Sequence, residues 1–244
     1  MRGPIATLVL ALVAIMPAAA AGFETTAREA ILIDDTTGAI LLEKNADQLM
    51  PPSSMSKIMT VYMVFERLRD GSLAMEDELP VSETAWRMGG SKMFIDVGSR
   101  VKVADLLRGV IVQSGNDATI ALAEGLAGSE DAFADQMTAR AHALGMTNST
   151  FKNASGWPHE DHLTTARDLA LLASRIIRDF PDYYPLFAET EFTYNGIHQG
   201  NRNPLLYKDL GADGLKTGHT ADAGYGLTAS AVRDGRRLIL VLNG

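Results

Sequence analysis

The segment Pro52-Ser53-Ser54-Met55-Ser56-Lys57-Ile58-Met59-Thr60 opens a helical pattern in this chain. From Ser54 onward, apolar side chains recur at helical spacing until Gly71. The pattern predicts a helix that begins close to Ser54 and ends at Gly71. Residues three positions apart share one face of a helix, so Lys57 is expected one turn from Ser54. Ser53 lies four positions from Lys57, and the three-residue spacing therefore selects Ser54.

Strand patterns lie toward both ends of the chain. Residues 30–34 and 39–42 are apolar runs that flank a turn, in which Gly38 can take a positive φ. Between Gly71 and Gly98 the sequence is polar, and we expect loop with short strands there. Near the carboxyl end, a second hairpin with a turn at Asn195-Gly196 and three strands are predicted, over residues 191–197, 214–217, 225–232 and 237–242.

The sequence between these strand regions is mainly helical. Ser129 is expected to cap one helix and Gly145 to end it, and Thr165 is expected to open another. The predicted helices cover residues 104–112, 117–126, 130–144 and 166–178. Strands at both ends with helices between them favour an α+β architecture. We expect an antiparallel sheet built from both chain ends, flanked by helices, with an inserted helical subdomain.

Composition limits the classes of protein to consider. With 244 residues and 46% hydrophobic content, the chain can bury one substantial core or two unequal subdomains. Its net charge is -8, and no run of Lys or Arg stands out, so a nucleic-acid partner is not expected. The chain has no cysteine, which excludes disulfides and thiolate metal sites.

The first residues have the pattern of a secretory signal peptide. Arg2 is followed by an apolar run over residues 5–16 and by small residues at 18–21. The apolar run is shorter than the ~20 residues that a membrane-spanning helix needs. We therefore expect a signal peptide over residues 1–21, an exported protein, and a mature domain over residues 22–244.

Two more short motifs follow in chain order, Ser114-Gly115-Asn116 and Lys216-Thr217-Gly218. With Ser54 and Lys57 they match the signature of penicillin-recognising serine enzymes, which implies acyl transfer through a serine ester. A serine hydroxyl is a weak nucleophile until a base takes its proton. Lys57 can act as that base only as a neutral amine, and burial and the nearby cation Lys216 would both lower its pKa.

The second and third motifs offer groups that complete this chemistry. Ser114 and Asn116 fall in a turn between two predicted helices. There the Ser114 hydroxyl can relay a proton, and the Asn116 amide can orient Lys57 or hold a substrate amide. The third motif lies on a predicted edge strand, along which a substrate can be held by backbone hydrogen bonds. Lys216 and Thr217 can bind a carboxylate.

Close approach and oxyanion binding involve three further groups. Gly218 is expected to leave room for the ligand beside the edge strand. The backbone N–H groups of Ser54 and His219 are the candidate oxyanion donors.

The chain resembles the D-alanyl-D-alanine carboxypeptidases of serine peptidase family S11, the low-molecular-mass penicillin-binding proteins of bacterial envelopes. The resemblance begins at residues 52–60 and covers nearly all of the mature chain. Further matching segments are residues 107–109, 113–118, 128–133, 192–196, 201–203 and 213–220. The resemblance implies the penicillin-binding/β-lactamase-like fold, a transpeptidase-like serine catalytic domain and a location in the periplasm or cell envelope.

The resemblance also implies a reaction and roles for individual residues. The reaction is removal of the terminal D-alanine from peptidoglycan stem pentapeptides through a Ser54 acyl-enzyme, with β-lactams as inhibitors and without a cofactor. Lys57 would be the general base and Ser114 the proton relay. Lys216 would bind substrate, and Arg202 and Thr217 match positions near the terminal carboxylate.

Members of this family usually continue beyond the strand that ends here at Gly244. A helix on the sheet, often a β-rich domain, and an amphipathic membrane-binding helix follow in them. The chain therefore reads as truncated, without the membrane-anchoring element, and we expect an uncovered apolar face on its sheet.

Several alternatives remain open from the sequence. A D,D-endopeptidase that cuts peptide cross-links would use the same residues, and a weakly active binding protein would keep the site without useful turnover. A class A β-lactamase is disfavoured, because no suitable Glu-x-x-x-Asn segment is found. The run His159-Glu160-Asp161-His162 lacks the spacing of a zinc-binding His-Glu-x-x-His helix, so we interpret it as a polar loop and expect no metal.

Overall fold

The computed structural model describes residues 24–244, so the expected signal peptide over residues 1–21 lies outside the described residues. Within the described part, no helix combines the length and the apolar character needed to cross a membrane.

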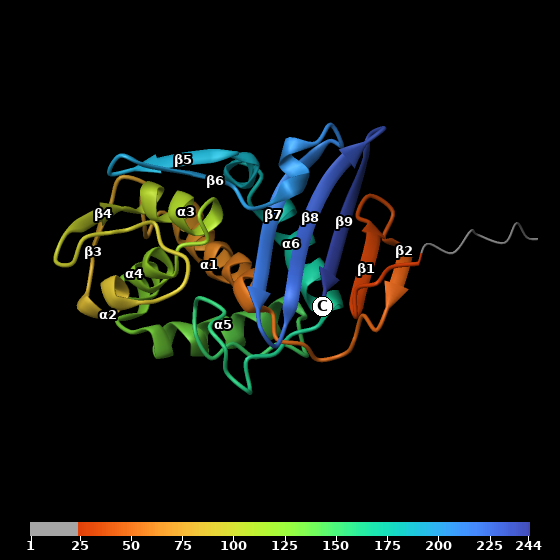
Figure 1. Ribbon diagram of the computed structural model, residues 1–244, viewed down its shortest axis with the longest axis horizontal. Coiled ribbons are helices and arrows are strands. Elements are labelled where there is room, and N and C mark those ends of the chain that lie inside the picture. Colours follow the sequence, from red (N-terminus) through yellow and green to blue (C-terminus); the bar gives the residue numbers. More distant parts are fainter. Residues whose placement is uncertain (1–23) are drawn as a thin grey trace, which may run out of the picture.

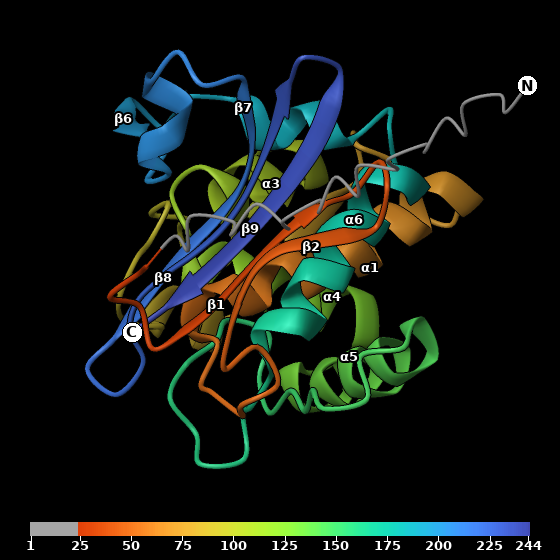
Figure 2. The same cartoon turned by 90° about the vertical axis from the view of Figure 1, so that its right-hand side faces the viewer.

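A five-stranded antiparallel sheet forms one side of the molecule (Figure 1). Its order is β2-β1-β9-β8-β7. The strands are β1 (Glu29–Asp34), β2 (Ala39–Lys44), β7 (Ala212–Thr220), β8 (Gly224–Arg233) and β9 (Arg236–Asn243). The first strand pairs with the last along its whole length, from Glu29 opposite Asn243 to Asp34 opposite Leu238 (Figure 2). The expectation of a sheet built from both chain ends is therefore confirmed, and β7 is an edge strand as predicted.

Helices cover one face of this sheet and form a second region beyond it. Figure 1 shows the sheet on one side of α1 (Lys57–Asp70) and the smaller elements on the other. These smaller elements are β3 (Glu78–Pro80), α2 (Glu83–Arg87), β4 (Arg100–Lys102), α3 (Val103–Ile111) and α4 (Asn116–Ala127). The helix α5 (Glu130–Leu144) packs on α1 and α4, and α6 (Ala166–Asp179) packs on β1, β8 and β9. The predicted hairpin is β5 (Glu191–Tyr194) and β6 (Ile197–Gly200).

Local signals in the sequence explain where several helices begin and end. The Ser129 hydroxyl accepts a hydrogen bond from Ala132 N at 3.1 Å, and Thr165 Oγ1 accepts one from Asp168 N at 3.0 Å. Gly71 and Gly145 end their helices with φ of 77° and 99°, a region that glycine enters without steric cost. The short helix α2 was not expected, since five residues are too few to show a helical period.

The central helix α1 is buried on nearly every side. Ten of its 14 residues are buried, which is the pattern of a helix enclosed by a core rather than lying on a surface. One of these ten is the first residue of the helix, Lys57, which is fully buried. The fold therefore encloses an amine at the junction of the sheet and the helical region.

The two faces of β9 differ in their surroundings. Ile239 and Val241 are buried on the face that α6 covers. Leu238, Leu240 and Leu242 alternate with them, so they point to the opposite face, where each is partly exposed. That face of the sheet is accordingly apolar in the described part.

A buried carboxylate at the start of α4 holds the loop that follows α2. Asp117 accepts hydrogen bonds from three successive backbone N–H groups of this loop, those of Met93, Phe94 and Ile95, at 3.0, 2.9 and 3.3 Å. Asp117 is 0% exposed. Without the carboxylate, these donors would lose their partner inside the protein.

We predict that Asp117→Ala lowers the free energy of unfolding by about 3 kcal/mol, because buried N–H groups are left unsatisfied. Denaturant unfolding measures the effect. Asp131→Ala is the matched control, since Asp131 also lies in the first turn of a helix but is exposed. It should cost less than about 1 kcal/mol. Equal losses in the two variants would contradict this account of Asp117.

Candidate active site

Residues 52–56, here called the nucleophile turn, carry Ser54 into a cleft between β7 and the helical region. The turn is a 3₁₀ segment, Ser53–Ser56, that continues into α1. Glycines allow close approach on two sides. A Cβ on Gly156 would overlap the Ser53 carbonyl oxygen, and a Cβ on Gly218 would overlap Ser53 Oγ and lie 3.1 Å from Pro52 O. Gly218 was expected to leave room for a ligand. It lines the cleft, but its missing side chain lets β7 pack against the nucleophile turn.

The amine of Lys57 lies at the centre of the site. Its Nζ is 3.0 Å from Ser54 Oγ and 2.7 Å from Asn116 Oδ1, and it also contacts the backbone carbonyl oxygen of Ser155. A neutral amine has two N–H bonds and one lone pair. The two carbonyl oxygens can accept only, so they take the two N–H bonds and leave the lone pair for the Ser54 hydroxyl. The contacts therefore suit a neutral lysine that accepts the proton of Ser54.

Electrostatics favour the same protonation state. Burial holds the pKa of Lys57 well below its usual value of 10.5, and the positive charges of Lys216 and Arg202 lower it further. The carboxylates of Glu130 and Asp117 act in the opposite direction but more weakly. A lysine whose pKa is lowered in this way can act as a general base.

Asn116 and Ser114 stand at the turn between α3 and α4. The Asn116 Nδ2 donates to Gly89 O at 2.8 Å, which leaves Oδ1 directed at Lys57. This is the arrangement expected for an amide that orients the lysine. Ser114 has a φ of 59° and is 2% exposed, and it lines the same cleft as Ser54.

Two further cations give the cleft a positive end. Lys216 is 3% exposed and donates to Thr217 O at 3.1 Å, and burial, with a smaller contribution from Arg202, lowers its pKa to about 7. The Arg202 Nη1 donates to Ser91 Oγ, and partial loss of hydration lowers the pKa of the Arg202 guanidinium. Among residues 24–244, neither cation is paired with a carboxylate. Both are therefore free to bind an anionic group.

The structure brings all the residues selected from the sequence to one place. The cleft has a volume of about 600 Å³, and its lining includes Ser54, Ser114, Arg202, Thr217, Gly218 and His219. Lys57, Asn116 and Lys216 are buried beside it. The exposed ring of His219 packs on Tyr225, with ring centroids 4.3 Å apart.

Sequence reasoning missed three contributors. Ser155 acts through its backbone carbonyl, which leaves no mark on residue type. The Ser91 hydroxyl accepts from Arg202, and its backbone carbonyl accepts from Asn116 N at 2.7 Å. In the sequence, Ser91 lies in a polar stretch without a motif. Residues 159–162 form a loop, as interpreted from the sequence, but its last residue, His162, is only 2% exposed, which the sequence did not indicate.

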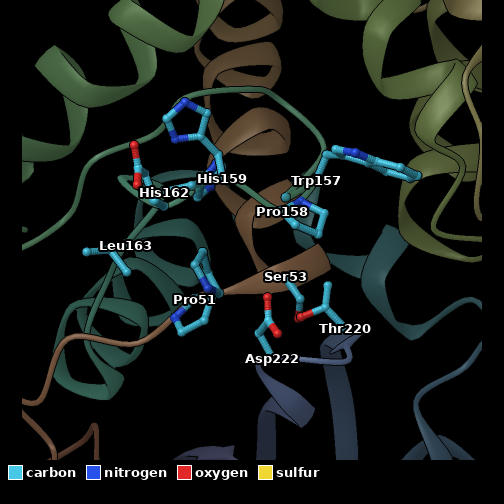
Figure 3. Close-up of a pocket in the computed structure, with 12 residues that line it drawn as sticks. Pro51, Ser53, Trp157, Pro158, His159, His162, Leu163, Thr220 and Asp222 are labelled. Atoms are coloured by element: carbon cyan, nitrogen blue, oxygen red, sulfur yellow. The ribbon is translucent and has the colours of Figure 1, made fainter.

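A second pocket of about 380 Å³ lies against the nucleophile turn (Figure 3). Pro51, Ser53, Trp157, His162 and Thr220 are among its lining residues. The lysines and Ser114 of the cleft are not among them, so this pocket is separate from the group of residues that could perform acyl transfer.

We predict that Lys216→Gln moves the acid limb of the pH–rate profile for Ser54 acylation to higher pH. With Lys57 as the base, the acylation rate should rise with pH through the pKa of Lys57, and removal of a neighbouring cation raises that pKa. Stopped-flow acylation by a chromogenic β-lactam measures the profile. Lys208→Gln removes an exposed charge and is the matched control. An unmoved limb in Lys216→Gln would contradict the electrostatic coupling.

Sequence comparison with known proteins identifies the family. Residues 15–244 match the family model of D-alanyl-D-alanine carboxypeptidases, peptidase family S11. The carboxypeptidase DacC of Escherichia coli K12 is 46% identical over 225 residues, which are 89% of this chain and 56% of that protein. DacA of Haemophilus influenzae is 43% identical over 226 residues, 91% of this chain and 58% of that protein. The chain thus spans somewhat more than half the length of these curated relatives.

Solved structures give the same result for the fold. The carboxypeptidase DacD from Francisella tularensis aligns with a TM-score of 0.91 and 36% identity, over 97% of this chain and 69% of that chain. Penicillin-binding protein D2 from Listeria monocytogenes, in its ampicillin-bound form, aligns with a TM-score of 0.82 and 31% identity, over 91% of both chains. From the family match, the fold and the assembled site, the chain belongs to the D-alanyl-D-alanine carboxypeptidase family, S11, and has the α+β fold of penicillin-binding proteins.

Proposed function

We propose that this protein is a serine D-Ala-D-Ala carboxypeptidase that removes the terminal D-alanine from peptidoglycan stem pentapeptides. The observation that carries the proposal is the contact between Ser54 Oγ and Lys57 Nζ, at 3.0 Å, in surroundings that favour a neutral amine. The family match and the names of the curated relatives support the substrate class.

Acylation follows from the position of each group. Ser54 Oγ attacks the carbonyl carbon between the two D-alanines while Lys57 takes the hydroxyl proton. The carbonyl oxygen becomes an oxyanion, and the N–H groups of Ser54 and His219 are its proposed donors. The lysine then releases its proton through Ser114 to the leaving amine, the C–N bond breaks, and free D-alanine departs.

Deacylation uses the same base. A water molecule attacks the ester carbonyl, Lys57 takes one of its protons, and the ester bond to Ser54 breaks. The proton returns to Ser54 Oγ, which leaves a tetrapeptide with a new carboxylate and restores the enzyme.

The positive charges at one end of the cleft would explain why the proposed enzyme acts at the carboxyl terminus of a peptide. The substrate carboxylate would bind Lys216, Thr217 and Arg202, and this pairing compensates charges that lack a carboxylate partner in the described part. β-Lactams carry a carboxylate beside a reactive amide, so the same residues would accept them. The ampicillin-bound structure of the Listeria relative supports this extension.

The proposed place of action is the bacterial cell envelope, where stem peptides are found. The pattern of residues 1–21 supports export.

A D,D-endopeptidase activity is the alternative, and a D-alanyl-D-alanine endopeptidase from Pseudomonas aeruginosa is 32% identical over 217 residues. The stronger matches carry the carboxypeptidase name, so that activity is the one we propose.

We predict that Ser54→Ala lowers D-alanine release from a pentapeptide by at least about 10³-fold and abolishes the mass adduct with benzylpenicillin. Ser53→Ala is the matched control, because it removes the neighbouring hydroxyl, which is buried without a partner in the described structure. It should keep both the adduct and the turnover. Intact-mass spectrometry and a D-alanine assay on the same samples give the result.

The contradicting outcomes are distinct. An adduct that survives in Ser54→Ala would refute the assignment of the nucleophile. An adduct without D-alanine release would refute turnover, and cleavage of cross-linked dimers without release of D-alanine would favour the endopeptidase.

A further inference from the structure

His162 is a buried histidine outside the group of residues used in the proposed reaction. It lies in the loop between α5 and α6 and is 2% exposed. Figure 3 shows it in the wall of the second pocket, which Ser53 of the nucleophile turn also lines. The histidine thus lies beside the turn that carries the nucleophile.

Two hydrogen bonds connect this histidine to the backbone next to Ser54, and a third joins it to Lys152. Lys152 N lies 3.3 Å from His162 Nδ1, His162 Nε2 lies 2.8 Å from Ser56 Oγ, and Ser56 Oγ lies 2.9 Å from Ser53 O. A backbone N–H can only donate, so Nδ1 must accept from Lys152. The ring proton is then on Nε2 and is donated to Ser56 Oγ. The Ser56 hydroxyl keeps its own proton for the Ser53 carbonyl.

Ser53 O, the last acceptor in this series of hydrogen bonds, belongs to the peptide group between Ser53 and Ser54. Ser53 O and Ser54 N are atoms of one planar peptide unit, so a hydrogen bond that fixes the carbonyl also fixes the direction of the Ser54 N–H. That N–H is the proposed oxyanion donor. It needs to be fixed, because Ser53 has a φ of 46°, a conformation that costs free energy for any residue but glycine.

We propose that His162 is a positioning residue: through Ser56 it holds the Ser53–Ser54 peptide so that the Ser54 N–H points at the developing oxyanion. The inference rests on the proposed function. Burial lowers the pKa of His162 to about 4, with smaller contributions from His159 and Lys57, so the ring is neutral at neutral pH and keeps an acceptor for Lys152. The ring of Phe151 packs edge-on against it, with ring centroids 5.5 Å apart, and adds to the packing around the histidine.

The test compares His162→Leu, His162→Gln, Ser56→Ala and the double variant of His162→Leu with Ser56→Ala. We expect His162→Leu to lower the rate of benzylpenicillin adduct formation by about 10- to 100-fold, since a misdirected oxyanion donor weakens transition-state stabilisation. For the peptide, kcat should fall while KM changes less than about twofold, because ground-state binding is retained. Glutamine can place a donor near the position of Nε2, so His162→Gln should restore most of the rate.

The remaining variants separate positioning from general stability. Ser56→Ala should lose as much rate as His162→Leu, and the double variant should lose no more, since both changes break one chain of hydrogen bonds. Phe151→Leu is the matched control, because it removes packing from His162 but leaves the hydrogen bonds. It should lower the melting temperature and leave the acylation rate unchanged.

Two outcomes would overturn the inference while leaving the proposed function intact. One is a wild-type acylation rate in His162→Leu, and the other is a loss in Phe151→Leu as large as that in His162→Leu. Absence of any adduct in the wild-type protein would overturn both the proposed function and this inference.

Discussion

Burial of the Lys57 amine is the constraint on which the site depends. An ammonium removed from water loses its hydration, so the protein must either pair it with an anion or favour its neutral form. Here two carbonyl oxygens, from Asn116 and Ser155, take two N–H bonds, and the cations Lys216 and Arg202 disfavour a third proton. The surroundings therefore make a base out of a residue that is ordinarily charged, and Ser54 lies where the lone pair points.

This constraint explains why four separate parts of the chain converge. Lys57 begins the enclosed helix α1, Asn116 begins α4, Ser155 lies in the loop before α6, and Lys216 lies on the edge strand β7. The pairing of β1 with β9 completes the sheet that holds β7 in place. Because Gly156 and Gly218 have no side chain, the nucleophile turn packs closely between that loop and β7. A substitution that adds a side chain at Gly156 or Gly218 would displace the nucleophile turn and so affect the reaction, although it removes no reacting group.

Much of this could be predicted from the sequence because the signals are local or periodic. The hairpin around Gly38, the caps at Ser129 and Thr165 and the edge position of β7 follow from turn chemistry, capping and the order of strands. Backbone groups and buried polar contacts have no such signal. The carbonyl of Ser155 could belong to any residue type, and His162 lies among polar neighbours in sequence although the fold buries it. The short helix α2 escaped detection for lack of length.

The most direct test of the account is the titration of the Lys57 amine itself. NMR of protein labelled at the lysine side chains follows each ε-carbon and Nζ with pH, and Lys57→Arg assigns the signal. The account predicts that Lys57 loses its proton well below 10.5 and is the neutral partner of Ser54 when acylation is fast. A Lys57 signal that remains protonated up to its ordinary value, in an enzyme that still acylates, would contradict the assignment of this lysine as the base.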